Sequence, residues 1–279
     1  MCIRDRSNNP VFRRAEGFNG KGTTYPASGM SYPSYGSPTA PPTTVTSGPM
    51  TIDSVVQKTG IVLVVMVAAA AVTWLMTGNP TIANAAGDRA ATQLYTLSLV
   101  GALGGFALSM VNSFKRQVSP TLVIAYAVLE GVFIGAMSKT FQLVFGQGVV
   151  TGAVLGTIAA FGGTLAAYKF FNISVGDKFR HWVTAAMFGF VAVSLLDLVL
   201  GMFHSSIGFN GLGTMGLVSS FIGVGIAVLM LIMDFDYVER GIAAGLPERE
   251  SWRAAFGLAV TIVWLYIELL RILSILRSN

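Results

Sequence analysis

Seven long apolar stretches occupy most of the chain beyond residue 60, and they restrict its fold more than any other feature. Each holds about 20 mostly apolar residues, the length of a helix that crosses a bilayer. The stretches are residues 60–77, 95–113, 121–141, 149–169, 182–203, 213–235 and 254–275. In hydrocarbon every backbone N–H and C=O must pair inside the protein, so such stretches form helices. The sequence therefore predicts an all-α membrane protein with seven transmembrane helices.

The composition is typical of a protein of this kind. The chain is 53% hydrophobic and 11% charged, whereas an average soluble domain is about 25% charged. The net charge of +5 does not indicate a nucleic-acid-binding protein, because the 18 basic residues are spread over the N-terminal region and alternate loops. The single Cys2 excludes an intrachain disulfide and a cluster of thiolate metal ligands. The expected partner is a lipid bilayer, and no nucleic acid is expected.

Residues 1–50 differ in composition from the rest of the chain. They are rich in Gly, Pro, Ser, Thr and Asn without apolar periodicity, so they cannot bury enough surface to offset the entropy of ordering. We therefore expect a disordered tail over residues 1–50 and a seven-span membrane domain over residues 51–279. The segment 31–42, where Tyr and Pro are scattered among small residues, is a candidate binding site for a partner. A solvated tail is the alternative.

Basic residues lie mostly at one end of the predicted spans. Nine lie at the end where the chain enters the first span, and two lie at the opposite end. The nine are Lys58, Lys115, Arg116, Lys169, Lys178, Arg180, Arg240, Arg249 and Arg253, and the two are Arg89 and Lys139. Because Lys and Arg accumulate on the cytoplasmic side, we predict a cytoplasmic N-terminus and a C-terminus outside. Arg271 and Arg277, near the C-terminus, are expected to extend to the outer interface.

Paired glycines recur one helical turn apart in three successive spans. The pairs are Gly101 with Gly105, Gly131 with Gly135, and Gly152 with Gly156. Small residues at this spacing let helix backbones approach closely in lipid. A self-dimerising face is one interpretation, but the occurrence in three successive spans favours packing within a monomeric bundle. The further glycines expected to support the same close packing are Gly162, Gly163, Gly223 and Gly225.

Acidic side chains occur in the predicted spans, where an ionisable group is unfavourable and therefore a candidate functional residue. They are Asp234 and Asp236 at the end of the sixth span, Glu268 in the seventh, Glu130 in the third and Asp197 in the fifth. With a rise of about 1.5 Å per residue, they are expected to form a series from the inner edge to the outer half of the bilayer. Thr261 lies seven residues before Glu268 on the same helix face, so both can point into the bundle.

Most of these acids also have a structural interpretation. Asp236 can pair with Arg240 four residues further on, and Glu268 can pair with Arg271 three residues further on. Asp197 can simply reach the outer interface. Both interpretations stay open for each of these residues.

Glu130 has no basic residue within one helical turn, so a carboxyl group there must be protonated or paired across helices. Carboxylate and carbonyl oxygens suit hard cations such as Ca²⁺. A path lined by the acids would therefore favour such cations and respond to protons. The sequence contains no residue set for nucleophilic catalysis, phosphate binding or zinc coordination. We therefore expect no enzyme activity, no cofactor and no firm metal site, with Ca²⁺ as a possible transported ion.

These features resemble the Bax inhibitor-1 family, and most closely its bacterial branch. The resemblance lies in the seven spans, in Glu130-Gly, in Asp-Phe-Asp-Tyr-Val-Glu from Asp234, and in Leu-Tyr-Ile-Glu-Leu-Leu-Arg-Ile-Leu from Leu265. It covers about residues 50–279. It implies six helices packed around a central seventh. In the members studied as channels it implies a pH-sensitive calcium leak, which for this branch would lie in the plasma membrane.

In those members an aspartate at the end of the sixth helix pairs with an aspartate in the seventh, and protonation controls opening. The resemblance puts Asp234, or Asp236 in the neighbouring register, at the first position. The seventh span has no Asp, and different alignments put Thr261 or Glu268 at the second position. Depth favours Thr261, because Glu268 should lie too far toward the outside to touch Asp234.

Two functional hypotheses follow. The first is a pH-sensitive calcium or cation leak channel with Asp234, Glu130 and Glu268 lining or gating its path. The second is a non-conducting regulator that binds another membrane protein, such as a membrane protease complex, through the tail or the cytoplasmic loops. Deletion of the tail distinguishes them, because a leak should survive it and a tail-mediated interaction should not.

Overall fold

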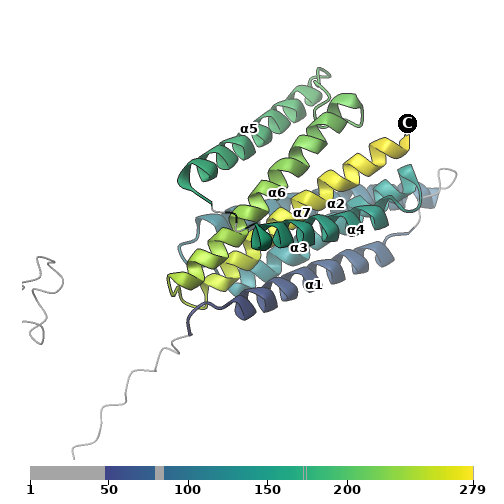
Figure 1. Ribbon diagram of the computed structural model, residues 1–279. Helices are drawn as coiled ribbons and strands as arrows, with labels where there is room; N and C mark the ends of the chain where they lie inside the picture. Colours follow the sequence, from purple (N-terminus) through teal and green to yellow (C-terminus); the bar gives the residue numbers. More distant parts are fainter. Residues whose placement is uncertain (1–47, 79–84, 172, 174, 279) are drawn as a thin grey trace, which may run out of the picture. The chain divides into compact units, whose positions relative to one another are not determined.

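The chain folds into a bundle of α-helices, and the computed structural model describes residues 48–278 except 79–84, 172 and 174. The helices are α1 (Ile52–Met76), α2 (Ala85–Phe114), α3 (Pro120–Phe145), α4 (Val149–Phe170), α5 (Asp177–Met202), α6 (Thr214–Ala243) and α7 (Glu250–Ser278) (Figure 1). All seven are long and apolar enough to cross a membrane, which confirms the predicted spans and the all-α class. The predicted disordered tail lies outside the described residues up to residue 47.

The helices extend beyond the apolar stretches that predicted them. α1 begins at Ile52 rather than residue 60, because Thr51 and Ser54 cap its first turn reciprocally. The Ser54 N–H donates to Thr51 Oγ1 at 3.1 Å, and the Thr51 N–H donates to Ser54 Oγ at 3.2 Å. α6 continues past its predicted end at residue 235 to Ala243, where charged side chains one turn apart pair with each other.

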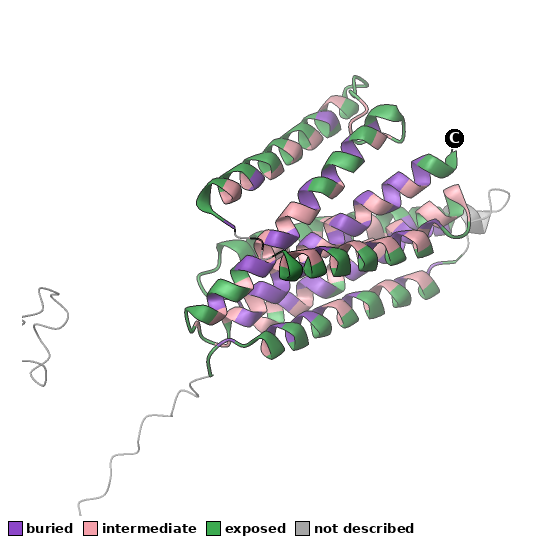
Figure 2. Cartoon of the chain, viewed as in Figure 1, coloured by how far each residue is buried: buried purple, intermediate pink, exposed green. Residues whose placement is uncertain are grey.

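α7 is the central helix of the bundle. Its apolar segment is the most buried of the seven and that of α5 is the least buried, as the purple α7 and the largely green α5 of Figure 2 show. The backbone of α7 packs against α1, α3, α4 and α6, whereas α2 packs on α3 and α5 packs on α6. The expected central seventh helix is therefore present, with four helices directly around it and with α2 and α5 in outer positions.

The paired glycines lie at contacts between helices of the same bundle. Gly131 and Gly135 of α3 face the backbone of α1, and Gly101 of α2 faces the backbone of α3. Gly152 and Gly156 of α4 face leucine side chains of α7. The prediction that these motifs serve packing within the bundle is confirmed.

The other four glycines do not all behave as expected. Gly162, Gly163 and Gly225 have open space beside them, so the expectation that they support close packing is wrong. Their faces point away from the neighbouring helices, which the sequence alone does not reveal. Gly223 does lie at a close contact, against the side chain of Glu268.

Gly135→Ala is expected to lower the stability of the bundle by about 1–3 kcal/mol, because overpacking a helix contact displaces backbone. A Cβ at this position would lie 2.8 Å from Ala70 Cα of α1. Gly162→Ala is the matched control, because nothing lies within 4 Å of its added Cβ. Thermal unfolding of the detergent-solubilised protein measures both variants. Equal shifts in the two midpoints would contradict the assigned contact.

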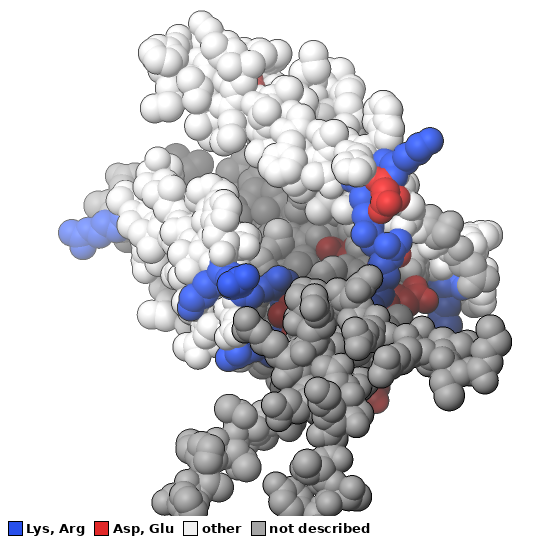
Figure 3. All heavy atoms as spheres, turned by 90° about the vertical axis from the view of Figure 1, so that its left-hand side faces the viewer, with Lys and Arg blue, Asp and Glu red and all other residues white. Residues whose placement is uncertain are grey.

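Basic side chains gather at the end of the bundle that carries the α6–α7 loop, and Figure 3 looks onto this end. At the opposite end, two basic side chains donate hydrogen bonds to backbone carbonyl groups. Lys139 is buried in α3, and its Nζ donates to Trp74 O at 2.8 Å and to Thr77 O, at the C-terminus of α1. Arg277 Nη1 donates to Gln147 O at 2.5 Å, in the α3–α4 loop. Lys139 is therefore an internal helix cap and not an end-of-span surface charge.

The residues that precede α1 are attached to the α6–α7 loop. The Met50 N–H donates to Leu246 O at 2.7 Å, and the Glu248 N–H donates to Gly48 O at 2.8 Å. The Met50 side chain is fully buried, and Lys58 Nζ pairs with Glu248 Oε1 at 2.8 Å. The bundle therefore starts before residue 51, and the entering segment is fixed to the loop that joins α6 to α7.

Candidate functional site

The α6–α7 seam is the contact between two antiparallel helices, and it holds two acids separated by an apolar layer. Its residues are Gly223, Ala227, Leu231 and Asp234 on α6, and Gly257, Thr261, Leu265 and Glu268 on α7. On each helix they lie three, four or seven residues apart, so they share one face. The seam therefore brings the acids of two different spans onto one line.

Asp234 lies in the half of the seam nearer the α6–α7 loop. The Thr261 hydroxyl donates to Asp234 Oδ2 at 2.7 Å. Gly257, one turn before Thr261, lies beside the carboxylate, and a Cβ there would lie 3.6 Å from Asp234 Oδ1, an ordinary van der Waals contact. Among the described residues no cation pairs with Asp234. The depth argument placed Thr261 opposite Asp234, and the structure agrees.

Glu268 lies farther along the seam, toward the C-terminal end of α7. Its carboxyl group fills the space beside Gly223, where an added Cβ would lie 2.8 Å from Glu268 Cδ. Arg271 Nη1 lies 3.6 Å from Glu268 Oε2, which is the expected pairing at a long distance. Within the described part of the chain Glu268 Oε2 has no hydrogen bond. Glu268 is therefore a buried acid with one loosely held counter-ion.

An apolar layer separates the two acids. The contacts of Asp234 with Thr261 and of Gly223 with Glu268 fix the register of the two helices. In that register Ala227 of α6 and Leu265 of α7 lie between the two acidic levels, and both are 0% exposed. The polar groups of the seam are therefore not continuous in this conformation.

Asp236 lies away from the seam, in a cluster of charges at the α4–α5 loop. Arg240 Nε lies 3.0 Å from its carboxylate, as the sequence spacing allowed, and Arg180 of α5 also pairs with it. Arg240 donates in addition to Val175 O. The Arg180 partner is far away in sequence and was not foreseen. Asp236 thus connects α6 to the α4–α5 loop. Asp234 is therefore the aspartate that faces α7.

Asp197 organises the loop between α5 and α6. Its carboxylate accepts hydrogen bonds from the N–H groups of Ile207 at 2.6 Å, Gly208 at 3.0 Å and Asn210 at 2.7 Å. Three backbone donors occupy the carboxylate, so it does not join the acids of the seam. Asp197 therefore has a structural role, but not the expected one: it is buried and holds the loop backbone instead of reaching the outer interface.

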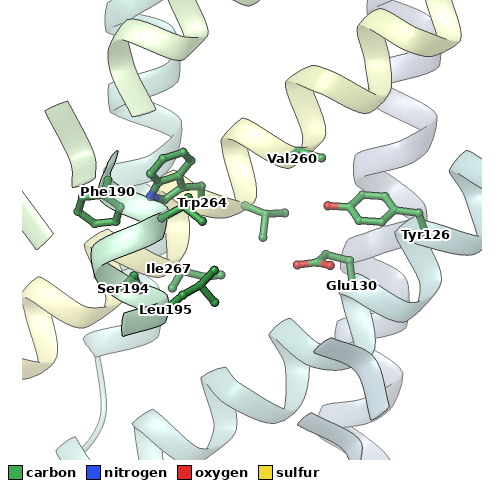
Figure 4. A pocket seen from close by; sticks show the side chains of 10 residues that line it. Tyr126, Glu130, Phe190, Ser194, Leu195, Val260, Trp264 and Ile267 are labelled. Atoms are coloured by element: carbon green, nitrogen blue, oxygen red, sulfur yellow. The ribbon is translucent and has the colours of Figure 1, made fainter. Parts of the chain in front are cut away.

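Glu130 is on α3 and approaches a different face of α7 from Asp234. Figure 4 shows its carboxyl group beside the Tyr126 ring, pointing toward Val260 and Trp264 of α7. On the helical wheel these two α7 residues lie to one side of Thr261, so Glu130 does not share the seam. The expected single series of acids is therefore split among the seam, the α4–α5 loop, the α5–α6 loop and this separate position.

The sequence interpretation missed several uncharged residues of the seam, although it named Thr261 and Gly223. Gly257 lies beside Asp234, and its signal was a glycine one turn before Thr261. Leu265 and Ala227 form the apolar layer, and one more leucine or alanine in a span gives no signal at all. In the described residues no three His, Cys, Asp or Glu side chains lie close enough to hold a metal ion together. A cation at Asp234 would therefore need hydroxyl, backbone or water oxygens as further ligands.

Comparisons with known proteins show which family the chain belongs to. An uncharacterized protein of Chlamydia muridarum (strain MoPn / Nigg) is 31% identical to this chain over 119 residues. That alignment covers 43% of this chain and 47% of the relative, so the match spans about half of each protein. A family model described as Bax inhibitor 1 like matches residues 9–278, which begins earlier than the expected residue 50. With nearly its whole length matched, the chain belongs to the Bax inhibitor 1 like family.

Proposed function

We propose that this protein is a calcium, or more broadly cation, leak channel whose path follows the α6–α7 seam. The observation that carries the proposal is Asp234, a carboxylate inside a membrane-spanning helix that accepts a hydrogen bond from Thr261. Its charge is not neutralised by any basic side chain in the described residues. An acid in this setting attracts a mobile cation. The resemblance to family members studied as calcium leaks points the same way.

The apolar layer gives the path a closed state. A hydrated cation that reaches Asp234 from the α6–α7 loop meets Ala227 and Leu265 before it reaches Glu268. Apolar constrictions of this kind stop ions by excluding water. Opening then requires a small separation of α6 from α7, and Glu268 supplies oxygen ligands beyond the layer. Glu130, Asp236 and Asp197 stand outside this path.

Asp234→Asn is expected to reduce Ca²⁺ entry into dye-loaded proteoliposomes at least about tenfold, which corresponds to about 1.4 kcal/mol in the barrier. Protons and cations compete for the carboxylate, so entry into parent liposomes should rise as the pH is raised from about 6 to about 8. The amide cannot ionise, so this rise should be absent in Asp234→Asn. Asp53→Asn, at an exposed acid in the first turn of α1, is the matched control. A folded parent protein without flux above empty liposomes would contradict the proposal.

The proposed location is the bacterial plasma membrane, with the N-terminus in the cytoplasm and the C-terminus outside. The structure strengthens the charge argument for this orientation. Lys139 and Arg277 cap backbone carbonyls, and Arg271 is buried. Two of the four basic residues at the proposed outer end, Lys139 and Arg271, are therefore buried in internal contacts, which leaves Arg89 and Arg277 as the exposed counterweight to the basic end.

A non-conducting regulator is the second candidate function, and the attachment of residues 48–50 to the α6–α7 loop favours it. A partner that binds the tail and displaces residues 48–50 would also displace the loop that joins α6 to α7. Deletion of residues 1–46 leaves this attachment intact. Flux that survives the deletion supports the leak, whereas loss of a co-purifying membrane protein without any flux supports the regulator.

A further inference from the structure

A groove outside the seam lies between α2 and α5 and contains Glu130. Two adjoining cavities share Tyr126, Glu130 and Val260, so α3 and α7 form the floor of the groove. The cavity on the α5 side has a volume of about 310 Å³, and the cavity on the α2 side about 220 Å³. The backbones of α2 and α5 pack neither on each other nor on α7, which leaves the groove open.

The groove opens toward the lipid rather than toward either aqueous end. Leu195 on its α5 wall is 58% exposed and Phe106 on its α2 wall is 61% exposed, and both helices are membrane spans. Glu130 lies ten residues after Pro120, the first residue of α3, which places it about 15 Å along the helix. That depth is about the middle of the hydrocarbon core. A molecule dissolved in the bilayer can therefore reach this carboxyl group from the side.

Among the residues that line the two cavities, Glu130 has the acidic side chain, and none has a basic one. Within the described residues its carboxylate has no hydrogen bond and no ion pair, and the Tyr126 ring lies beside it (Figure 4). Gly105 of α2 gives it space, because a Cβ there would lie 2.5 Å from Glu130 Oε2. Across the cavity the rings of Phe190 and Trp264 lie with centroids 5.7 Å apart. A carboxyl group without a partner, near aromatic faces, ionises when an ammonium group pairs with it, and the apolar walls accept a hydrocarbon chain.

We infer that the groove binds a lipophilic ammonium ion, a hydrocarbon chain with a cationic amine head, which enters from the bilayer. The head contacts Glu130 and the aromatic rings, and the chain lies against α5 and α7. This site is independent of the proposed leak, because it involves another face of α7 and its test measures binding rather than flux.

The test uses three photoreactive probes with the same twelve-carbon chain and an amine, an alcohol or a carboxylate head. The full-length protein in lipid nanodiscs is labelled by each probe, and the labelled peptides are identified by mass spectrometry. The amine is expected to label α3, α5 and α7 saturably, with an apparent affinity at least about tenfold higher than that of the alcohol. Equal labelling by the amine and the alcohol would overturn the inference and indicate ordinary lipid in the groove. Labelling that spreads over all lipid-facing helices would do the same.

Two further variants separate the site from a folding defect. Glu130→Gln should remove the advantage of the amine over the alcohol, and Glu130→Asp should keep part of it. Leu195→Trp, at a lipid-facing position, should fill the groove and reduce labelling by both probes without disturbing the core. Thermal unfolding checks that each variant is folded. Unchanged amine labelling in folded Glu130→Gln would refute the role of the carboxylate.

Discussion

Leu265→Asn is expected to raise Ca²⁺ entry at least about tenfold, which corresponds to a lowering of the barrier by about 1.4 kcal/mol. No other single change in the seam should produce a larger gain of flux. Leu265 is fully buried between the levels of Asp234 and Glu268. Asparagine has a similar size, so it fills the same space, but its amide holds water and offers an oxygen ligand to a passing cation. Entry into dye-loaded proteoliposomes is the measurement.

Leu270→Asn is the control for this prediction. Leu270 is also 0% exposed on α7, but it packs with Val149, Ala153 and Tyr266 on the opposite face of the helix. Each variant buries an amide in the core and should lose about 1–3 kcal/mol of stability. Flux should rise only for Leu265→Asn, because only that side chain stands between the two acids. An equal rise in both variants would mean that loosening of the bundle, rather than wetting of the seam, controls the leak.

Apolar length and helix rise make part of this protein predictable from its sequence. Seven spans follow from the lengths of the apolar stretches. Thr261 could be placed opposite Asp234, because both depths follow from residue counts along straight helices. The paired glycines could be assigned to packing within the bundle, because small residues at this spacing have few other uses in lipid.

The rotation of each helix about its own axis could not be predicted. Lipid is as apolar as the protein core, so a membrane helix shows no contrast between its inner and outer faces. That is why Glu130 was grouped with the acids of the seam, and why Gly162 was expected at a contact. Pairings such as Asp236 with Arg180, or Asp197 with the N–H of Ile207, depend on how loops fold back and have no local signal.

The ion pair at the end of the seam farther from the α6–α7 loop leads to the largest expected loss of stability. Arg271→Met is expected to lower the free energy of unfolding by about 3–5 kcal/mol, the usual effect of removing one partner of a buried pair. The buried guanidinium donates to Phe209 O and Gly211 O in the α5–α6 loop, and to Ser219 Oγ at 3.0 Å. It also lies 3.6 Å from Glu268 Oε2. Methionine keeps the length of the side chain but leaves the carboxylate and the carbonyls without their donor.

Three further variants separate charge from loop anchoring, each followed by unfolding of the detergent-solubilised protein. Glu268→Gln combined with Arg271→Met should recover part of the loss, because the unpaired buried charge is gone, and the double-mutant cycle gives the coupling. Arg271→Lys should restore the charge but not the loop contacts, because an ammonium group lacks the planar fork of donors. Arg277→Met, at an exposed arginine that also donates to a loop carbonyl, should have a much smaller effect. If Arg277→Met and Arg271→Met lower the free energy of unfolding equally, burial of the Glu268–Arg271 pair is not what stabilises this end of the seam. If the double variant is as unstable as Arg271→Met alone, the anchoring of the α5–α6 loop outweighs the ion pair, and Glu268 is free to act as an ion ligand.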